Sequence, residues 1–267
     1  MELGLKGRTA VIVGGSMGIG KAAALGLAAE GVNLVLLARG QESLDKAASE
    51  IASASSVDVV TIPTNMREAK AVNAAAEAAA SRFGPIHILV YTAGNRMRRP
   101  DRQILWEDED WLDDVNVKLI GMLRAIRAFL PHFAKDGSGR IINVGGSAGM
   151  MEWEKAMTHG INNSAMRHAS TYLARDLAAD RVTVNTIVPG LVATEWREGW
   201  ADARAKQQNK SREQFLVEYC EQKGILAGRW VDMREVADLI VFLASDRAQY
   251  INGTSLVIDG GLSINAR

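Results

Sequence analysis

The chain has 267 residues, of which 48% are apolar and 23% charged, so its composition is that of a globular protein and excludes wholesale disorder. Its 31 basic and 31 acidic residues give a formal net charge of zero, which offers no electrostatic reason to expect a nucleic acid or a membrane surface as main partner. A single cysteine excludes an intrachain disulfide, and no apolar run approaches the ~18 residues of a membrane span.

The cellular compartment is predicted from two features of the chain. A strand-like run follows directly after Arg8, which leaves no room for a signal peptide. The lone cysteine, Cys220, is typical of a reducing compartment. We therefore expect a cytoplasmic protein.

Short apolar runs alternate with longer helix-prone segments along most of the chain. In chain order, the predicted elements are strand 9–13, helix 21–30, strand 34–37, helix 41–54, strand 57–62, helix 69–83, strand 86–91, helix 106–132, strand 140–144, helix 162–179, strand 182–188, helix 235–244 and strand 255–258. Continuous apolar strands between helices are typical of a parallel sheet covered by helices on both faces. The predicted fold class is α/β, a single-domain Rossmann-type three-layer sandwich over residues 1–267.

A polar, helix-prone segment at about 194–229 interrupts this alternation after Pro189-Gly190. In an open α/β sheet, ligands bind beyond the carboxyl ends of the strands. An insertion at this point of the chain is therefore expected to cover the ligand site as a lid.

A glycine-rich sequence, Gly14-Gly15-Ser16-Met17-Gly18-Ile19-Gly20, follows the first predicted strand and opens the next helix. Glycines allow a tight turn and a close approach of the backbone to phosphate, while the free N–H groups at the helix start favour its negative charge. The order of strand, glycine loop and helix predicts a dinucleotide site. A turn whose glycines serve steric needs alone is the alternative.

The end of the second predicted strand favours NADP(H) over NAD(H). An NAD site places an acidic residue there to hold the ribose hydroxyls, whereas this chain has Ala38-Arg39. The missing carboxylate removes repulsion against a 2′-phosphate, and the guanidinium can pair with that phosphate. The alternative is that Arg39 is a solvated surface charge.

The motifs of the chain resemble, in order and over nearly its whole length, those of the short-chain dehydrogenase/reductase family. The segments that carry the resemblance are the glycine loop, Tyr91-Thr92-Ala93-Gly94, Val115-Asn116-Val117, Arg140 to Val144, Val184-Asn185 to Pro189-Gly190 with Thr194, and Asp259-Gly260-Gly261. The resemblance implies a seven-stranded parallel sheet and usually a homotetramer. It assigns cofactor binding to Gly14, Ser16, Gly18, Ile19, Gly20, Arg39, Asn65, Ala93, Gly94, Asn163, Pro189, Gly190, Val192 and Thr194.

The catalytic positions depart from the family pattern. The family uses a Ser that orients the carbonyl, a Tyr that exchanges a proton with it, and a Lys, four residues after the Tyr, that holds the nicotinamide ribose and lowers the Tyr pKa. The matching positions here are Gly146, His159 and Asn163, so the motif reads His-x3-Asn. Asn116 matches the family's helix Asn, and Ser147 directly follows the glycine.

Two interpretations of this departure remain open. In the first, redox catalysis is lost and the chain is a nucleotide-binding, regulatory or non-redox (isomerase- or lyase-like) protein. In the second, His159 replaces the Tyr as proton donor. A free Tyr titrates near pH ~10 and needs a cation to approach neutrality, whereas a free His titrates near ~6.5. A Lys beside a protonated imidazole would repel it, while the neutral Asn163 can still bond to ribose hydroxyls.

The sequence therefore predicts an NADP(H)-dependent oxidoreductase that interconverts a ketone and a secondary alcohol. His159 is the predicted acid/base, Asn163 a ribose contact, Asn116 a further member of the catalytic group and Ser147 an orienting group. A small-molecule carbonyl or alcohol is the predicted partner, without a nucleic acid or a membrane.

Other side chains are assigned around this site. Trp153 and Trp196 are predicted to line the substrate pocket, with packing of the lid against the body as the alternative for Trp196. Four arginines follow Gly94, and we expect them to pair with the acidic stretch 107–114. The alternative is that these arginines recognise an anionic substrate. These arginines are Arg96, Arg98, Arg99 and Arg102. The histidines and the cysteine lack metal-ligand spacing, so no metal site is predicted.

Overall fold

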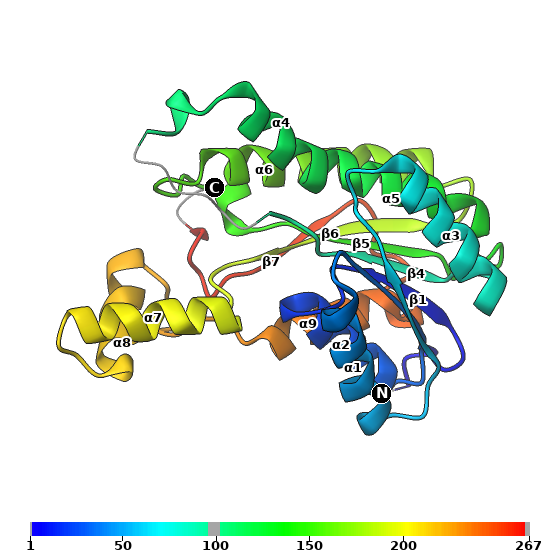
Figure 1. Ribbon diagram of the computed structural model, residues 1–267, viewed down its shortest axis with the longest axis horizontal. Coiled ribbons are helices and arrows are strands. Elements are labelled where there is room, and N and C mark those ends of the chain that lie inside the picture. Colours follow the sequence, from blue (N-terminus) through cyan, green and yellow to red (C-terminus); the bar gives the residue numbers. More distant parts are fainter. Residues whose placement is uncertain (1, 96–101, 265–267) are drawn as a thin grey trace.

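The computed structural model describes residues 2–95 and 102–264, and within them seven parallel strands form one sheet (Figure 1). The strands are β1 (Thr9–Val13), β2 (Asn33–Ala38), β3 (Val59–Pro63), β4 (Ile88–Tyr91), β5 (Arg140–Val144), β6 (Thr183–Pro189) and β7 (Ser255–Ile258). Their order across the sheet is β3-β2-β1-β4-β5-β6-β7. The chain reverses direction of winding between β1 and β4, which is where doubly wound sheets bind ligands. The predicted fold class is confirmed.

Helices cover both faces of the sheet because successive strand residues point to opposite sides. One face packs on α1 (Gly18–Ala29), α2 (Gln41–Ala54) and α9 (Met233–Ala244), with Ile12 and Leu36 among the strand residues in this core. The other packs on α3 (Ala69–Phe83), α5 (Gly121–Phe129) and α6 (Met157–Asp176), with Val11 and Val35 in the core. Figure 1 shows the two helix layers on either side of the strands.

The long helix expected at 106–132 is interrupted. It consists of α4 (Asp108–Val115), a π-helical turn (Asn116–Ile120), α5 and a final 3₁₀ turn at 130–132. Tyr91 at the end of β4 explains the interruption in part, because its buried hydroxyl donates to the carbonyl oxygen of Val117 at 2.5 Å. A β-carbon on Gly121 would lie only 2.5 Å from that hydroxyl oxygen, so glycine is required there. The π turn is a distortion that apolar periodicity does not reveal.

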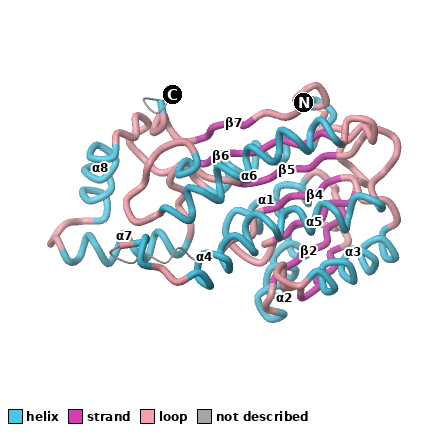
Figure 2. Tube along the Cα trace, turned by 90° about the horizontal axis from the view of Figure 1, so that it is seen from above, coloured by secondary structure: helices cyan, strands magenta, loops and turns pink. Residues whose placement is uncertain are grey.

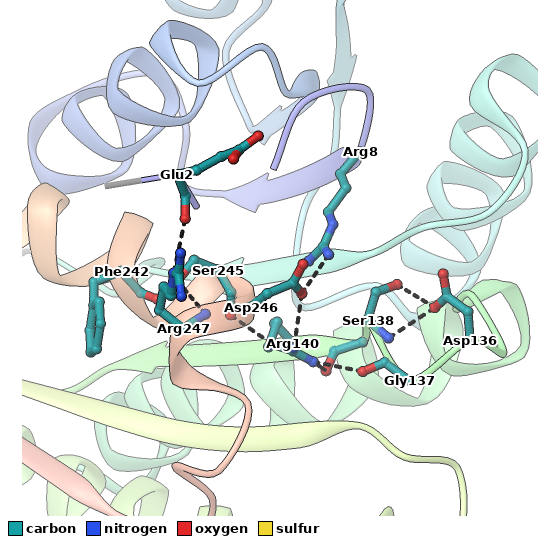
Figure 3. A network of polar contacts seen from close by, with 11 residues as sticks. Glu2, Arg8, Asp136, Gly137, Ser138, Arg140, Phe242, Ser245, Asp246 and Arg247 are labelled. Atoms are coloured by element: carbon teal, nitrogen blue, oxygen red, sulfur yellow. Dashed lines mark hydrogen bonds and ion pairs between the residues drawn. The ribbon is translucent and has the colours of Figure 1, made fainter. Parts of the chain in front are cut away.

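The amino-terminal edge of the sheet is fixed by a buried arginine. Arg140, at the start of β5, donates to the carbonyl oxygens of Gly137 at 3.0 Å and Ser245 at 3.4 Å. Its guanidinium also lies 3.6 Å from Asp246, which accepts from Arg8 at 2.6 Å. Figure 3 shows these side chains joining three distant segments of the chain. The candidate site lies at the opposite ends of the strands, which are their carboxyl ends.

Two helices extend beyond the carboxyl edge of the sheet. These are α7 (Glu195–Gln207) and α8 (Arg212–Lys223), referred to below as the α7–α8 segment, and both views place them to one side of the strands (Figures 1 and 2). A small aromatic core lies between them, in which Trp200 of α7 packs against Phe215 and Tyr219 of α8 and against Trp230, which follows α8. In the described parts of the chain, no helix has the length and apolarity to cross a membrane.

Candidate functional site

A cavity of about 210 Å³ opens at the carboxyl ends of β5 and β6. Residues 145–148 after β5, residues 189–192 after β6, and the amino-terminal turn of α6 form its walls. Ile19 of the glycine loop, Trp153 and Glu154 before α6, and Thr194 and Arg197 at the start of α7 also line it. The predicted residues Ile19, Ser147, Trp153, His159, Pro189, Gly190, Val192 and Thr194 all line this cavity. These residues, which the resemblance to the family assigned to one site, therefore lie together although some are more than 170 positions apart in the sequence.

The glycine loop is built for close contact. Gly14 and Gly18 have φ of +88° and +56°, a region that favours glycine. A β-carbon on Gly14 would lie 2.5 Å from Thr92 Oγ1 and 3.1 Å from the amide nitrogen of Ala93, so the loop rests on the turn after β4. On the other side, a β-carbon on Gly18 would be 3.9 Å from the Thr194 methyl group. The glycine loop thus lies against the turn after β4 and near Thr194, and both belong to segments that the resemblance assigns to cofactor binding.

The amino terminus of α1 suits an anion. Its N-cap residue Met17 makes no side-chain capping bond, and the described first turn holds no acidic residue. The first N–H groups of a helix carry partial positive charge and need acceptors. Together with the close-packed glycines, this fits the pyrophosphate of a dinucleotide.

We expect Gly20→Ala to lower both stability and dinucleotide affinity. A β-carbon at residue 20 would lie 2.1 Å from the carbonyl oxygen of Gly14, so the loop has to move. Overpacking of this kind costs about 1–3 kcal/mol, which corresponds to a melting temperature lower by about 2–10 °C in a thermal scan. Gly199→Ala is the control, because nothing lies within 4 Å of that position. An unchanged melting temperature and an unchanged NADPH affinity for Gly20→Ala would contradict the tight-loop assignment.

The three positions that depart from the family pattern meet in the structure. A β-carbon added at Gly146 would lie 3.1 Å from Asn163 Nδ2 and 3.7 Å from His159 Nε2. The turn that carries Gly146 is pressed against α6, because a β-carbon on Gly160 would be 2.8 Å from the carbonyl oxygen of Ala148. Ser164 Oγ also donates to the Gly149 carbonyl at 2.8 Å. His159 is half-buried and faces the cavity, where an imidazole can give or take a proton.

Asn163 carries an unsatisfied amide. The residue is only 2% exposed, and among the described residues neither Oδ1 nor Nδ2 finds a hydrogen-bond partner. A buried amide without partners costs free energy, and such groups in native proteins usually await a ligand or a water. This observation fits a cofactor whose hydroxyl groups reach this side chain.

The remaining predicted cofactor residues lie further along the same edge. Arg39 is exposed directly after β2, and Ala93 and Gly94 follow β4. Asn65 follows β3, where its amide donates to Glu68 at 2.6 Å and accepts from the Arg67 amide at 3.2 Å. Its local contacts therefore organise the start of α3.

Asn116 does not reach the cavity. It begins the π turn, and its Oδ1 accepts from Arg124 Nη1 at 2.7 Å. The same arginine atom donates to the Met66 carbonyl at 2.9 Å. The Asn116 side chain thus ties the interrupted helix to the segment after β3, and its part in catalysis stays a prediction.

The two predicted substrate residues differ in position. Trp153 lines the cavity and packs against the aromatic core of the α7–α8 segment, and its buried Nε1 has no partner among the described residues. Trp196 is 52% exposed and is not among the cavity-lining residues, whereas the next residue, Arg197, is. Sequence reasoning missed Arg197; its place three residues after the helix-capping Thr194 was the available signal. Arg96, Arg98 and Arg99 lie outside the described residues.

Comparisons with known proteins agree with this geometry. A family model described as Enoyl-(Acyl carrier protein) reductase matches residues 13–263. Oxidoreductase UcpA of Salmonella typhimurium is 34% identical over 262 residues, which are 97% of this chain and 96% of that protein.

Two solved structures share the architecture at comparable identity. L-Sorbose reductase from Gluconobacter frateurii, complexed with NADPH and L-sorbose, gives a TM-score of 0.91 at 29% identity over 98% of both chains. A single-substitution variant of actinorhodin polyketide ketoreductase with NADPH gives 0.85 at 26% identity, covering 96% of this chain and 97% of that one. From fold, site and relatives together, the chain belongs to the short-chain dehydrogenase/reductase family of oxidoreductases.

Proposed function

We propose that this protein is an NADP(H)-dependent reductase of small ketones that uses His159 as its acid/base. The observation that carries the proposal is the meeting of Gly146, His159 and Asn163 at one end of the cavity. If the family's catalytic residues had been lost by random substitution, an imidazole facing the cavity and an unsatisfied amide beside it would not be expected at these positions. The NADPH complexes of two structural neighbours support the choice of cofactor.

Each residue of the site would have its own role in cofactor binding or in proton transfer. The glycine loop and the start of α1 bind the pyrophosphate, and Arg39 binds the 2′-phosphate. The Asn163 amide takes ribose hydroxyls as its missing partners. When bound, the reduced nicotinamide supplies a hydride to the carbonyl carbon, and His159 supplies the proton that the carbonyl oxygen then needs. Ser147, at the cavity wall, orients that oxygen.

The α7–α8 segment, within the predicted lid 194–229, would close the substrate side of the cavity. Arg197 and Thr194 connect it to the cavity wall, and Trp153 joins its aromatic core to the loop before α6. Exclusion of water by such a cover would strengthen the electrostatic interactions inside.

The test is NADPH oxidation by purified protein over a panel of ketoses, cyclic diketones and simple ketones, followed by the fall in NADPH absorbance and by product analysis. We expect one alcohol formed per NADPH consumed for at least one class of substrate. NADPH binding without turnover over the whole panel would instead favour the non-redox interpretation.

The predicted homotetramer and cytoplasmic location rest on the family resemblance and the cysteine usage. Large apolar side chains are exposed on the helices of one face, among them Leu112 on α4 and Ile161 and Tyr172 on α6. We expect light scattering to give a mass of four chains. A monomer at micromolar concentration would overturn the assignment.

A further inference from the structure

A buried lysine lies between two strand ends of the proposed cofactor site. Lys118 belongs to the π turn and is only 6% exposed. Its Nζ donates to the carbonyl oxygen of Val144 at 2.9 Å, where β5 ends. The same nitrogen lies 3.8 Å from the position that a β-carbon on Gly94 would take after β4. The ammonium therefore sits at the carboxyl ends of two central strands.

These two contacts connect Lys118 to both halves of the site. Gly94 follows Ala93, whose amide nitrogen lies against Gly14 of the glycine loop. Val144 leads directly into Gly145 and Gly146, which line the cavity beside His159. The lysine thus touches the turn that supports the phosphate loop and the strand end that leads to the acid/base.

This buried lysine lies in the π turn and not in a regular α-helix. In a regular amphipathic helix a lysine is expected on the solvent face, with its ammonium in water. Here the Tyr91 hydroxyl holds the carbonyl of Val117, the residue before Lys118. The helix distortion and the buried Tyr91 hydroxyl therefore occur together with the buried ammonium of Lys118.

The elements packed around Lys118 leave its charge only partly balanced. Burial lowers the pKa of Lys118 to about 8, and Asp114 on α4 opposes that shift. Arg124 on α5 is turned toward Asn116 and Met66. On α6, His159 faces the cavity, and on β4 burial raises the pKa of Tyr91, which stays neutral.

We propose that Lys118 is the cation of the dinucleotide site and that cofactor binding draws a proton onto it, an inference that rests on the proposed binding of NADP(H). The hydrogen bond to Val144 uses one of the three N–H donors of the ammonium. A dinucleotide brings a pyrophosphate and ribose hydroxyls to the turn beside it, and these stabilise the ammonium over the amine. Asn163 has left the usual motif without its positive charge, and Lys118 supplies one from a different helix.

Linkage turns this placement into a measurable effect. A ligand that binds the protonated form better raises the proton affinity of the lysine by the same factor. Below about pH 7 the ammonium is already formed, so binding takes up no proton there. Between about pH 8 and 9.5 binding takes up a proton, and NADPH affinity falls by up to about tenfold per pH unit.

The experiment is calorimetric titration of the wild-type protein with NADPH at pH 8.5, in two buffers of different ionisation enthalpy. We expect uptake of about half a proton or more per NADPH bound. A free imidazole titrates near pH ~6.5 and a phosphate monoester near pH ~6, both well below the pH of this titration. NADPH binding with no buffer dependence would overturn the role of Lys118 and leave the proposed function intact, whereas failure to bind NADPH would overturn both.

Two variants test whether Lys118 is the group that takes up the proton when NADPH binds. Lys118→Met keeps the length and apolar stem of the side chain, and we expect it to abolish the uptake and to weaken NADPH binding at pH 7. Lys135→Met is the control, because Lys135 is 66% exposed and lies beside Asp180, away from the cavity residues. Uptake that persists in Lys118→Met would show another group to be responsible and contradict the proposal. Should Lys118→Met fail to fold, the wild-type titration still decides.

Discussion

Replacement of His159 by alanine is expected to lower kcat for NADPH-dependent ketone reduction by about 10²–10⁴-fold, the usual contribution of a positioned general acid. The dissociation constant of NADPH should change little, because the predicted contacts of the cofactor lie in the glycine loop, after β2 and at Asn163. Stopped-flow measurement of NADPH oxidation, with NADPH affinity from fluorescence, separates the two quantities.

A second histidine on the same helix provides the matched control. His168 is exposed and packs edge-on against Tyr172, away from the cavity residues, so His168→Ala should keep full turnover. A His159→Ala protein with wild-type kcat would end the acid/base assignment. Equal losses in both variants would point to a structural effect on α6 instead.

Substitution toward the family motif tests the electrostatic argument for the pair. His159→Tyr alone should recover little activity, since the neutral Asn163 replaces the cation that stands four residues after the Tyr in the family motif, and the Lys118 ammonium donates to the Val144 carbonyl instead. The double variant His159→Tyr/Asn163→Lys should exceed the sum of the single effects, because each new residue depends on the other. Gly146 is left unchanged in both variants, because a β-carbon there would lie 3.1 Å from Nδ2 of the wild-type Asn163.

The sheet and most of its helices could be predicted from the sequence because apolar periodicity is a local property. The strands 9–13, 140–144 and 255–258 and the helices 41–54 and 69–83 have the predicted bounds. The resemblance to the family then grouped Gly146, His159 and Asn163, which meet in the structure because α6 packs against the turn that follows β5. On α7, Arg197 lines the cavity and the neighbouring Trp196 is 52% exposed, so a substrate contact of Trp196 stays a prediction.

Lys118 and the π turn were beyond the reach of local patterns. A lysine in the middle of a helix indicates a solvated face in any sequence-based analysis, and nothing in the segment 116–120 marks the change of helical hydrogen bonding. One contact that accompanies this change comes from 26 residues away along the chain, where the Tyr91 hydroxyl donates to the Val117 carbonyl. The contacts of this lysine and of the turn around it are long-range, so only the three-dimensional structure reveals where the ammonium lies.

Arg39→Ala is expected to weaken NADPH binding by about 10- to 100-fold and to leave NADH binding within about twofold. The reason is the exposed position of Arg39 directly after β2, where the family places the group that distinguishes the two cofactors. A guanidinium there has a partner in the 2′-phosphate of NADPH and none in the 2′-hydroxyl of NADH. Dissociation constants for both dinucleotides, measured by fluorescence at low ionic strength, give the comparison.

Arg39→Asp carries the argument further, because a carboxylate repels the 2′-phosphate and can accept from ribose hydroxyls. The preference should then reverse toward NADH. Arg82→Ala is the matched control, since that arginine is 53% exposed on α3 and pairs with Asp58. If Arg39→Ala weakened both cofactors equally, the arginine would serve general electrostatic attraction. Added salt would then reduce the binding of NADPH and NADH alike, whereas a specific 2′-phosphate contact makes the NADPH affinity fall more steeply with salt than that of NADH.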